Sequence, residues 1–250
     1  MKILISPISL EEAAAIIEGG ADIIDIKNIK EGSLGANFPW RIREVSDFVH
    51  KHGVVASATL GDLPYKPGTA ALAAFGAASS GADYVKAGLY GMNTYQEAYD
   101  MMAGIAQAIR SVNPSLTVVA SGYADYRRFG GLNLHDLVKA AKDTKCNVVM
   151  VDTAIKDGST LFDALTMDEL KEFVALGHEA GMEVALAGSV KFEHAEKVFE
   201  TKADIVGVRG AVCEGKDRST TISAKKTREF CDLFRKMEAE LNGSLSKAVC

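Results

Sequence analysis

The segment "GADIID" (residues 20–25) decides how the chain divides into units, because related segments recur twice along it. These are "GADYVK" at 81–86 and "KADIVG" at 202–207, and each ends a helical pattern and begins a strand pattern. The first two segments lie 61 residues apart and the last two lie 121 apart. The spacings correspond to two and four units of about 30 residues. They place the three segments before the second, fourth and eighth strands of an eight-unit chain.

Eight short β-rich runs alternate with helical patterns, an arrangement that is typical of parallel sheets built from βα units. Strands are expected at 2–6, 22–27, 54–59, 83–87, 116–121, 147–152, 183–187 and 204–209. The number of units and the length of the chain together predict an α/β fold, a single TIM (β/α)8 barrel. We expect the barrel to occupy residues 1–241 and a C-terminal tail to follow at 242–250.

A doubly wound open sheet is the alternative architecture. It usually has fewer strands and would need a glycine fingerprint after the first one, whereas the sequence there reads "ISPISLEE" (5–12). Helix starts are marked by Ser9 with Glu12 and by Thr166 with Glu169, since each pair predicts a capping box. The barrel is therefore the favoured fold.

The composition argues against several classes of partner. The chain has 250 residues, 48% of them hydrophobic, a net charge of −5 and a pI near 5.6, so we expect neither nucleic acid nor an anionic membrane surface. No apolar run reaches the roughly 18 residues of a transmembrane helix. The cysteines and histidines show no metal-binding spacing, so no metal is expected. With no recognisable signal peptide, we expect a cytoplasmic protein with free thiols.

The stretch "ADIIDIKNIKEG" (21–32) carries two charges at the end of an otherwise apolar strand. Side chains alternate along a strand, so Asp25 and Lys27 point one way while Ile24 and Ile26 point the other way, toward the helices. Both charges are thus expected to face the barrel axis. They also lie at the carboxyl end of the strand, where the reactive residues of this fold are found.

Charged residues occupy the same end of the other even-numbered strands. The fourth strand holds Lys86, the sixth ends in Asp152 with Lys156 following, and the eighth ends in Arg209. Because alternate strands contribute each layer of side chains inside a barrel, these groups are expected to form a charged ring at the mouth. The fifth strand ends in small residues, which leaves Tyr123 or Arg127 in its loop as further candidates.

The chemistry expected of this ring begins with its lysines. A lone strand-end lysine is usually a solvated charge at the rim, but two of them beside two inward aspartates favour catalysis. Desolvation and a neighbouring cation both favour the neutral amine that attacks a carbonyl, and Lys27 and Lys86 can supply that cation to each other. Asp25 and Asp152 would orient ammonium groups or relay protons.

The loops after the seventh and eighth strands most often bind phosphate in this fold, through main-chain N–H groups. They read "AGSVKFEHA" and "VRGAVCEGKDRS", which makes Gly188, Ser189, Arg209 and Gly210 the candidate phosphate ligands. The alternative is that the two glycines merely permit tight turns. Longer loops follow strands two, three, five and six and suggest a lid over a small substrate.

Several of these segments resemble one known family. They are "GGADIIDIKNIKEGSLGANFPW", "GADYVKAGLYG", "VVMVDTAIKDGSTLFD" and "AGSVK…ADIVGVRGAVC", and the similarity runs along essentially the whole chain. The family is that of (5-formylfuran-3-yl)methyl phosphate synthase. Within it, "DIKNIKEGSLGAN" and "DTAIKDGSTLFD" are its most specific motifs.

The resemblance implies an enzyme of methanofuran biosynthesis that joins two molecules of glyceraldehyde 3-phosphate, losing phosphate and water. It implies a triose phosphate as the small-molecule partner, Lys27 as the Schiff-base lysine and Lys86 as proton acceptor. From the residues we add that Asp152 or Lys156 could also remove the proton. We expect no organic or metal cofactor.

Three other functions stay open at this point. A different class I aldolase would use the same lysine and release a linear product, and a phosphometabolite-binding barrel would bind without turnover. A structural scaffold would do neither and would leave the inward charges unexplained. The alanine-rich segment 70–78 is consistent with core packing or with the interface of a homo-oligomer.

Overall fold

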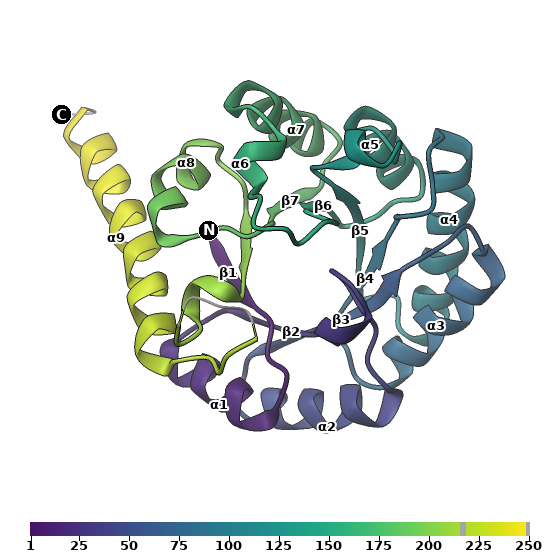
Figure 1. The fold of residues 1–250 in the computed structure, drawn as a ribbon, viewed down its shortest axis with the longest axis horizontal. Helices are drawn as coiled ribbons and strands as arrows, with labels where there is room; N and C mark the ends of the chain where they lie inside the picture. The colour runs from purple at the N-terminus through teal and green to yellow at the C-terminus, as the bar shows by residue number, and fades with distance from the viewer. Residues whose placement is uncertain (216–218, 249–250) are drawn as a thin grey trace.

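The computed structural model describes residues 1–215 and 219–248, with side chains placed as far as residue 241. Its strands form a closed parallel barrel, in which each strand pairs with the next in chain order and β8 pairs back with β1 (Figure 1). The strands are β1 (Lys2–Ile5), β2 (Ile23–Ile26), β3 (Val55–Asp62), β4 (Tyr84–Gly88), β5 (Thr117–Tyr123), β6 (Val148–Asp152), β7 (Glu183–Leu186) and β8 (Ile205–Val208). The TIM-barrel prediction is thus confirmed, and the open sheet is wrong.

The α-helices form a ring outside the strands, and the last of them extends beyond the body of the barrel (Figure 1). They are α1 (Leu10–Gly19), α2 (Pro39–His50), α3 (Pro67–Ser79), α4 (Tyr95–Val112), α5 (Leu134–Asp143), α6 (Leu161–Ala164), α7 (Met167–Glu179), α8 (Ala195–Glu200) and α9 (Ala224–Ala248). None of the described helices is long and apolar enough to cross a membrane.

The predicted strands agree with the observed ones apart from their ends. The largest difference is in β3, which continues to Asp62 although Gly61 in the sequence marks a turn. Between Thr59 and Asp62 the pairing with β4 shifts register, and Gly61 takes a φ of +113° that glycine adopts without strain. The strand therefore passes through the glycine instead of stopping there, and Asp62 is carried to the mouth of the barrel.

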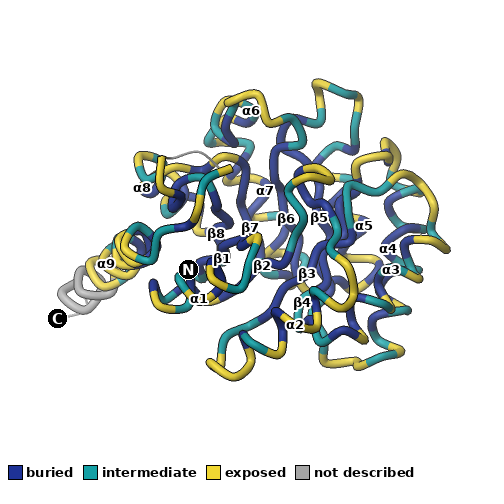
Figure 2. The backbone as a smooth tube through the Cα atoms, turned by 60° about the horizontal axis from the view of Figure 1, so that its bottom comes forward, coloured by how far each residue is buried: buried dark blue, intermediate teal, exposed yellow. Residues whose placement is uncertain are grey.

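Side chains alternate along β2 as its sequence predicts. Ile24 and Ile26 belong to the large core between strands and helices. Ile23 belongs to a smaller core inside the barrel, which also contains Leu4, Val119, Val148, Met150, Ala185, Ala187 and Ile205. Figure 2 shows this buried centre and the exposed outer faces of the helices. The inner core fills the barrel below Asp25, so the charged residues above it have an apolar floor.

The two predicted capping boxes have different outcomes. At α7, Thr166 accepts from the N–H of Glu169, and the Glu169 carboxylate accepts from the N–H of Thr166, so the box is complete. At α1, Ser9 accepts from the N–H of Glu12, but the Glu12 carboxylate accepts from the N–H of Ile8 instead of that of Ser9. The box at α1 is therefore half formed, because the glutamate side chain turns to other partners.

Two further expectations concern the outer parts of the chain. In α3, one face of the segment 70–78 packs into the core, while Leu72 and Phe75 stay exposed on the other. Helix α9 continues to Ala248 and so includes most of the expected tail at 242–250, whose last two residues lie outside the described part. The division of the chain into barrel and tail stays a prediction.

Close packing of α7 on the barrel gives a testable difference between two helical glycines. A Cβ atom added at Gly177 would lie 2.3 Å from Cγ2 of Val184, whereas one added at Gly76 would meet nothing within 4 Å. Gly177→Ala should lower the free energy of unfolding by roughly 1–3 kcal/mol through overpacking. Gly76→Ala should raise it by up to about 1 kcal/mol through helix propensity. Urea unfolding measures both, and an unchanged Gly177→Ala protein would contradict the packing.

Candidate active site

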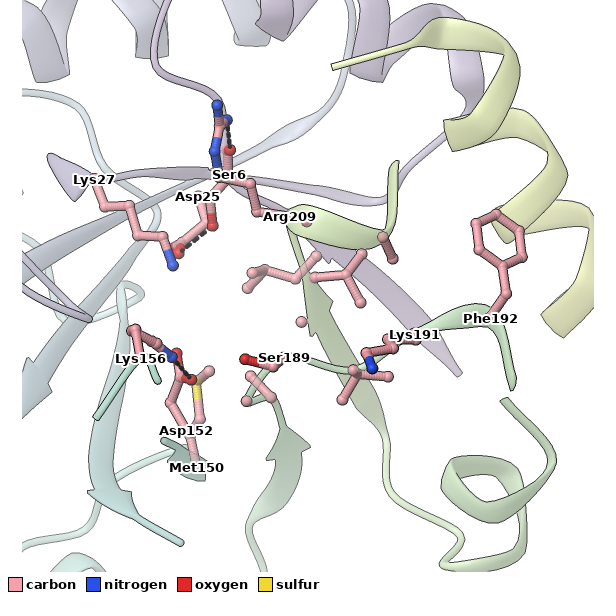
Figure 3. Close-up of a pocket in the computed structure, with 18 of the residues that line it drawn as sticks. Ser6, Asp25, Lys27, Met150, Asp152, Lys156, Ser189, Lys191, Phe192 and Arg209 are labelled. Atoms are coloured by element: carbon pink, nitrogen blue, oxygen red, sulfur yellow. Dashed lines mark hydrogen bonds and ion pairs between the residues drawn. The ribbon is translucent and has the colours of Figure 1, made fainter. Parts of the chain in front are cut away.

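A cavity of about 640 Å³ opens at the carboxyl ends of the strands, a size that is typical of small-molecule sites (Figure 3). Its walls come from β1, β2, β6 and β8 with the loops that follow them, from the loop after β7, and from one residue of β4. All the predicted site residues line it, namely Asp25, Lys27, Lys86, Asp152, Lys156, Gly188, Ser189, Arg209 and Gly210. The structure thus places them in one cavity, while their roles stay predictions.

The Asp25 carboxylate is fully buried at the base of this cavity and is surrounded by donors. Lys86 Nζ lies 3.0 and 2.9 Å from its two oxygens, Ser57 Oγ lies 2.8 Å from Oδ1, and Ser6 Oγ lies 3.1 Å from Oδ2. Burial alone would raise the pKa of Asp25, but the charges of Lys86 and Lys27 and these hydrogen bonds lower it overall. Asp25 is therefore an anion that holds Lys86 in place.

Lys27 differs from the other lysines of the cavity because no described residue forms a hydrogen bond or an ion pair with its Nζ. Its amine points into the cavity toward the open space between Asp25 and Lys156 (Figure 3). Burial lowers the pKa of Lys27 to about 8, with the attraction of Asp152 and Asp25 opposing the shift and the charges of Lys86 and Lys156 assisting it. With this pKa about a tenth of Lys27 is the neutral amine at pH 7, far more than for a lysine with an ordinary pKa near 10.4.

Asp152, the last residue of β6, and Lys156, in the loop that follows, form a second ion pair on the opposite wall. Lys156 Nζ lies 2.8 Å from Oδ1 of Asp152 and 3.0 Å from the hydroxyl of Thr153. Burial raises the pKa of Asp152, but Lys156, Lys27 and the N–H of Thr153 bring it down to about 2. Lys156 is partly exposed, unlike Lys86, so this pair meets solvent and the cavity together.

The loops after β7 and β8 carry main-chain N–H groups that are available to a ligand. Gly188 and Ser189 follow β7 with φ angles of +117° and +50°, and Gly210 opens a short 3₁₀ turn after β8. The N–H groups of Gly188, Ser189, Gly210 and Ala211 have no acceptor among the described residues. Most N–H groups in folded proteins are paired. Four unpaired ones at one end of the cavity suit an anion with several oxygens.

Arg209 contributes to this end of the cavity in a different way from the one expected. Its guanidinium donates to both oxygens of Glu12, at 2.7 and 3.2 Å, and also to the carbonyl oxygens of Ser6 and Thr220. Figure 3 shows that it turns toward Ser6 and away from Ser189. The guanidinium of Arg209 is therefore engaged with other groups of the protein. That residue 209 helps to bind phosphate stays a prediction for its main chain.

A hydrogen bond closes one half of the barrel mouth. Ser33, in the loop after β2, donates its hydroxyl to the carbonyl of Thr153 after β6, and these two strands are opposite each other in the barrel. Asp62 accepts from the N–H groups of Ser33 and Leu34 and from the hydroxyl of Tyr123. Leu34 is fully buried beside the end of β4. The loop after β2 thus covers the ends of β3 to β5.

Sequence reasoning missed several residues of the site. Ser6 and Ser57 belong to no recognisable motif. Asp62 directly follows Gly61, which in the sequence indicates a loop. Asp125 accepts from the N–H groups of Ala154 and Ile155 and so fixes the loop after β6. A small polar residue on an inward strand position was the available signal for the two serines, because such a position must face either the core or a buried charge.

Three side chains at or just after the end of β5 have defined partners. Tyr123 is the last residue of β5, and its pKa is raised well above the usual value by burial and by the nearby charge of Asp62, so it acts as a donor to Asp62. Arg127 and Arg128 pair with Glu169 and Asp157 on the surface. No group of His, Cys, Asp and Glu within the described residues could hold a metal ion.

Comparison with known proteins identifies relatives over most of the chain. Residues 3–231 match the model of a family described as 4-HFC-P synthase. A (5-formylfuran-3-yl)methyl phosphate synthase of Archaeoglobus fulgidus is 54% identical over 89% of this chain and 94% of its own length. The enzyme of the same name in Methanocaldococcus jannaschii is 52% identical over 92% of this chain and 100% of its own length.

Solved structures with the same fold are much more distant in sequence. 3-Hexulose-6-phosphate synthase has a TM-score of 0.61 at 20% identity, covering 92% of this chain and 99% of its own. Deoxyribose phosphate aldolase from Aeropyrum pernix has a TM-score of 0.59 at 17% identity, covering 91% of this chain and 87% of its own. At these identities the similarity supports the barrel fold alone.

The environment of Lys27 predicts how its reactivity depends on pH. Above a pKa of about 8 the amine is neutral, so reductive methylation of Lys27 with formaldehyde and cyanoborohydride should rise through pH 8 and then level off. A lysine with an ordinary pKa near 10.4 would still be gaining reactivity there. Peptide mass spectrometry after short reactions from pH 6 to 10 measures this, and a Lys27 profile that rises only near pH 10 would contradict the shift.

The bond across the mouth predicts local stability. Ser33→Ala removes the donor to Thr153, which should cost about 1 kcal/mol and speed hydrogen exchange in the loop after β2. Ser111→Ala removes a similar hydroxyl-to-carbonyl bond on the outer surface of α4 and serves as the control. Hydrogen–deuterium exchange measured by mass spectrometry compares the two. If Ser33→Ala leaves the exchange of the loop as it is in the control, the bond does not hold the loop closed.

Proposed function

Since the chain belongs to the 4-HFC-P synthase family, we propose that it condenses two molecules of glyceraldehyde 3-phosphate into (5-formylfuran-3-yl)methyl phosphate. The reaction would serve methanofuran biosynthesis. Atom balance requires that one phosphate and two waters leave. The observation that carries this proposal is that the amine of Lys27 has no hydrogen-bonding partner among the described residues. The other two candidate lysines of the cavity, Lys86 and Lys156, are each paired with an aspartate. An amine without such a partner is suited to attack an aldehyde.

The first step proposed is a Schiff base. The neutral Nζ of Lys27 adds to the aldehyde carbon of one triose, and the carbinolamine then loses its hydroxyl as water. Loss of that hydroxyl needs a proton, and Lys156 is the candidate donor because its ammonium reaches the cavity while Asp152 holds it. The positive iminium that results lies near both Asp25 and Asp152, whose charges favour it.

The iminium then serves as an electron sink for the neighbouring carbon. Removal of a proton there gives an enamine, which can expel phosphate from the next carbon or add to the aldehyde of the second triose. Lys86, the proton acceptor that family resemblance implies, must be neutral to do so. Asp25 would keep its Nζ in place throughout.

The phosphate of the substrate is assigned to the loops after β7 and β8. Their unpaired N–H groups lie at the end of the cavity away from β4, and the positive φ of Gly188 and Ser189 turns the chain there. Backbone donors suit phosphate because they bring no charge that must be neutralised in its absence. The same preference for phosphate would fit a phosphometabolite-binding barrel, an alternative that detection of turnover would exclude.

Borohydride trapping tests this function. Wild-type protein incubated with glyceraldehyde 3-phosphate and borohydride should carry one adduct, on Lys27, and without borohydride should develop the absorbance of a furan aldehyde. Lys27→Ala should lose the adduct and lower turnover by roughly 10³-fold or more. Lys30→Ala, an exposed lysine of the same loop, is the matched control and should behave as wild type.

Each alternative gives a distinct result in the same experiment. An adduct on Lys27 with a linear product and no furan absorbance would indicate another class I aldolase. Binding of triose phosphate that survives Lys27→Ala together with Lys86→Ala, with no turnover in the wild type, would indicate a binding barrel. An adduct on a lysine other than Lys27 would overturn the assignment of the nucleophile.

A further inference from the structure

The Glu12 carboxylate, on the first turn of α1, is buried and joins three separate segments of the chain. Its Oε2 accepts from the N–H of Ile8 at 2.8 Å and from the guanidinium of Arg209 at 2.7 Å. Its Oε1 accepts from the other guanidinium nitrogen at 3.2 Å and from the N–H of Ile222 at 3.3 Å. The loop after β1, the end of β8 and the far end of the loop after β8 thus meet on one side chain.

Burial makes this contact firm. The side chains of Glu12 and Arg209 are each 4% exposed, and a charge removed from water in this way is costly unless it is paired and hydrogen-bonded. Two parallel N–H to oxygen bonds also fix the orientation of a guanidinium more strictly than a single bond does. The placement of the Arg209 side chain is therefore set by α1, a helix that has no residue in the cavity.

The main chain that Arg209 fixes is the one that bears unpaired donors. Gly210 and Ala211 follow Arg209 directly, and their N–H groups have no acceptor among the described residues. Arg209 also donates to the carbonyl of Ser6, so the end of β8 is held to the end of β1 as well. A shift of the guanidinium would move these two N–H groups before it moved Lys27, which belongs to another strand.

We propose that Glu12 is a positioning residue for phosphate recognition. By binding the guanidinium of Arg209, it makes the loop after β8 present its main-chain N–H groups to the phosphate of the substrate. The positive charge of Arg209 is then neutralised by Glu12 and does not contact the substrate. Selectivity for a phosphorylated aldehyde depends instead on the geometry of the loop. This inference rests on the proposed function, because it assigns the phosphate of the Schiff-base substrate to these loops.

The consequence is a separation between phosphate selectivity and reaction at Lys27. Asp25 accepts from Lys86 on β4 and from Ser57 on β3, which Arg209 does not contact, and only its third donor, Ser6, lies beside Arg209. Loss of the Glu12 contact should therefore weaken the capture of phosphorylated aldehydes and leave the amine as reactive as before toward an unphosphorylated one. A purely structural role for Glu12 predicts instead that both reactions fall together.

Glu12→Gln is the variant that tests this, because it keeps the size of the side chain and removes its charge. The measurement is the rate of borohydride trapping on Lys27 at limiting concentrations of glyceraldehyde 3-phosphate and, separately, of glyceraldehyde. The ratio of the glyceraldehyde 3-phosphate rate to the glyceraldehyde rate should fall on the order of tenfold or more. An effect of this size is typical when a residue that orients a binding group is removed. Trapping of glyceraldehyde should stay within about twofold of wild type.

Two further variants make the result decisive. Glu12→Asp keeps a buried anion opposite Arg209 but shortens its reach, so it should fold even where Glu12→Gln does not, and it should lower the same ratio. Glu183→Gln is the matched control, since it breaks the ion pair of Glu183 with Lys2 at the opposite end of the barrel. It should leave the ratio unchanged. An unchanged ratio in a folded Glu12 variant, or an equal fall in both rates, would overturn the proposal.

Titration with inorganic phosphate separates this inference from the proposed function. Calorimetry should show weaker phosphate binding to the Glu12 variants than to the wild type, and this readout does not need Lys27. If the wild type traps no aldehyde but the Glu12→Asp variant binds phosphate more weakly than the wild type, the proposed reaction fails and the role of Glu12 stands. If wild type traps aldehydes and the Glu12 variants bind phosphate as wild type does, the role of Glu12 fails alone.

Discussion

A carboxylate and an ammonium group that are both removed from water must satisfy each other, and the Lys86–Asp25 pair imposes this requirement on the centre of the barrel. Each oxygen of Asp25 meets Lys86, and the remaining acceptor positions are filled by Ser6 and Ser57. The residues around the pair are thus fixed by its need for hydrogen bonds. Because Asp25 is fully used in this way, Lys27 two residues further along the chain has no carboxylate partner within the described residues.

Three of the four lysines that line the cavity, the candidates Lys27, Lys86 and Lys156, carry the same functional group in three environments. Lys86 is buried and paired, Lys156 is paired and partly exposed, and Lys27 is desolvated without a pair among the described residues. Burial favours the neutral form of an amine and a neighbouring anion favours the charged form. The balance of these two effects, and not the identity of the side chain, separates the candidate nucleophile from the candidate proton carriers.

Much of this arrangement follows from alternation along strands, which is why the sequence predicts it. Asp25 and Lys27 both face the cavity from β2 and its end, and the even-numbered strands bring Lys86 and Asp152 to the same cavity, as a parallel barrel requires. Contacts between loops and helices do not follow from a local pattern. Glu12 occupies the position at which the glutamate of a capping box is expected, but its carboxylate binds Arg209, which is 197 residues away in the sequence. Ser33 and Thr153 meet only because their strands are opposite each other.

The closed half of the mouth has a consequence for how such a barrel could change over evolutionary time. Ser33, Leu34 and Asp62 fill the space above β3 to β5 with groups that depend on one another, so single substitutions there disturb several contacts at once. The loops after β7 and β8 carry the wall with the unpaired main-chain N–H groups, and none of their described residues forms a hydrogen bond with Ser33, Leu34 or Asp62. We therefore expect drift in substrate preference to accumulate in the half of the mouth that these two loops form, while the closed half changes little.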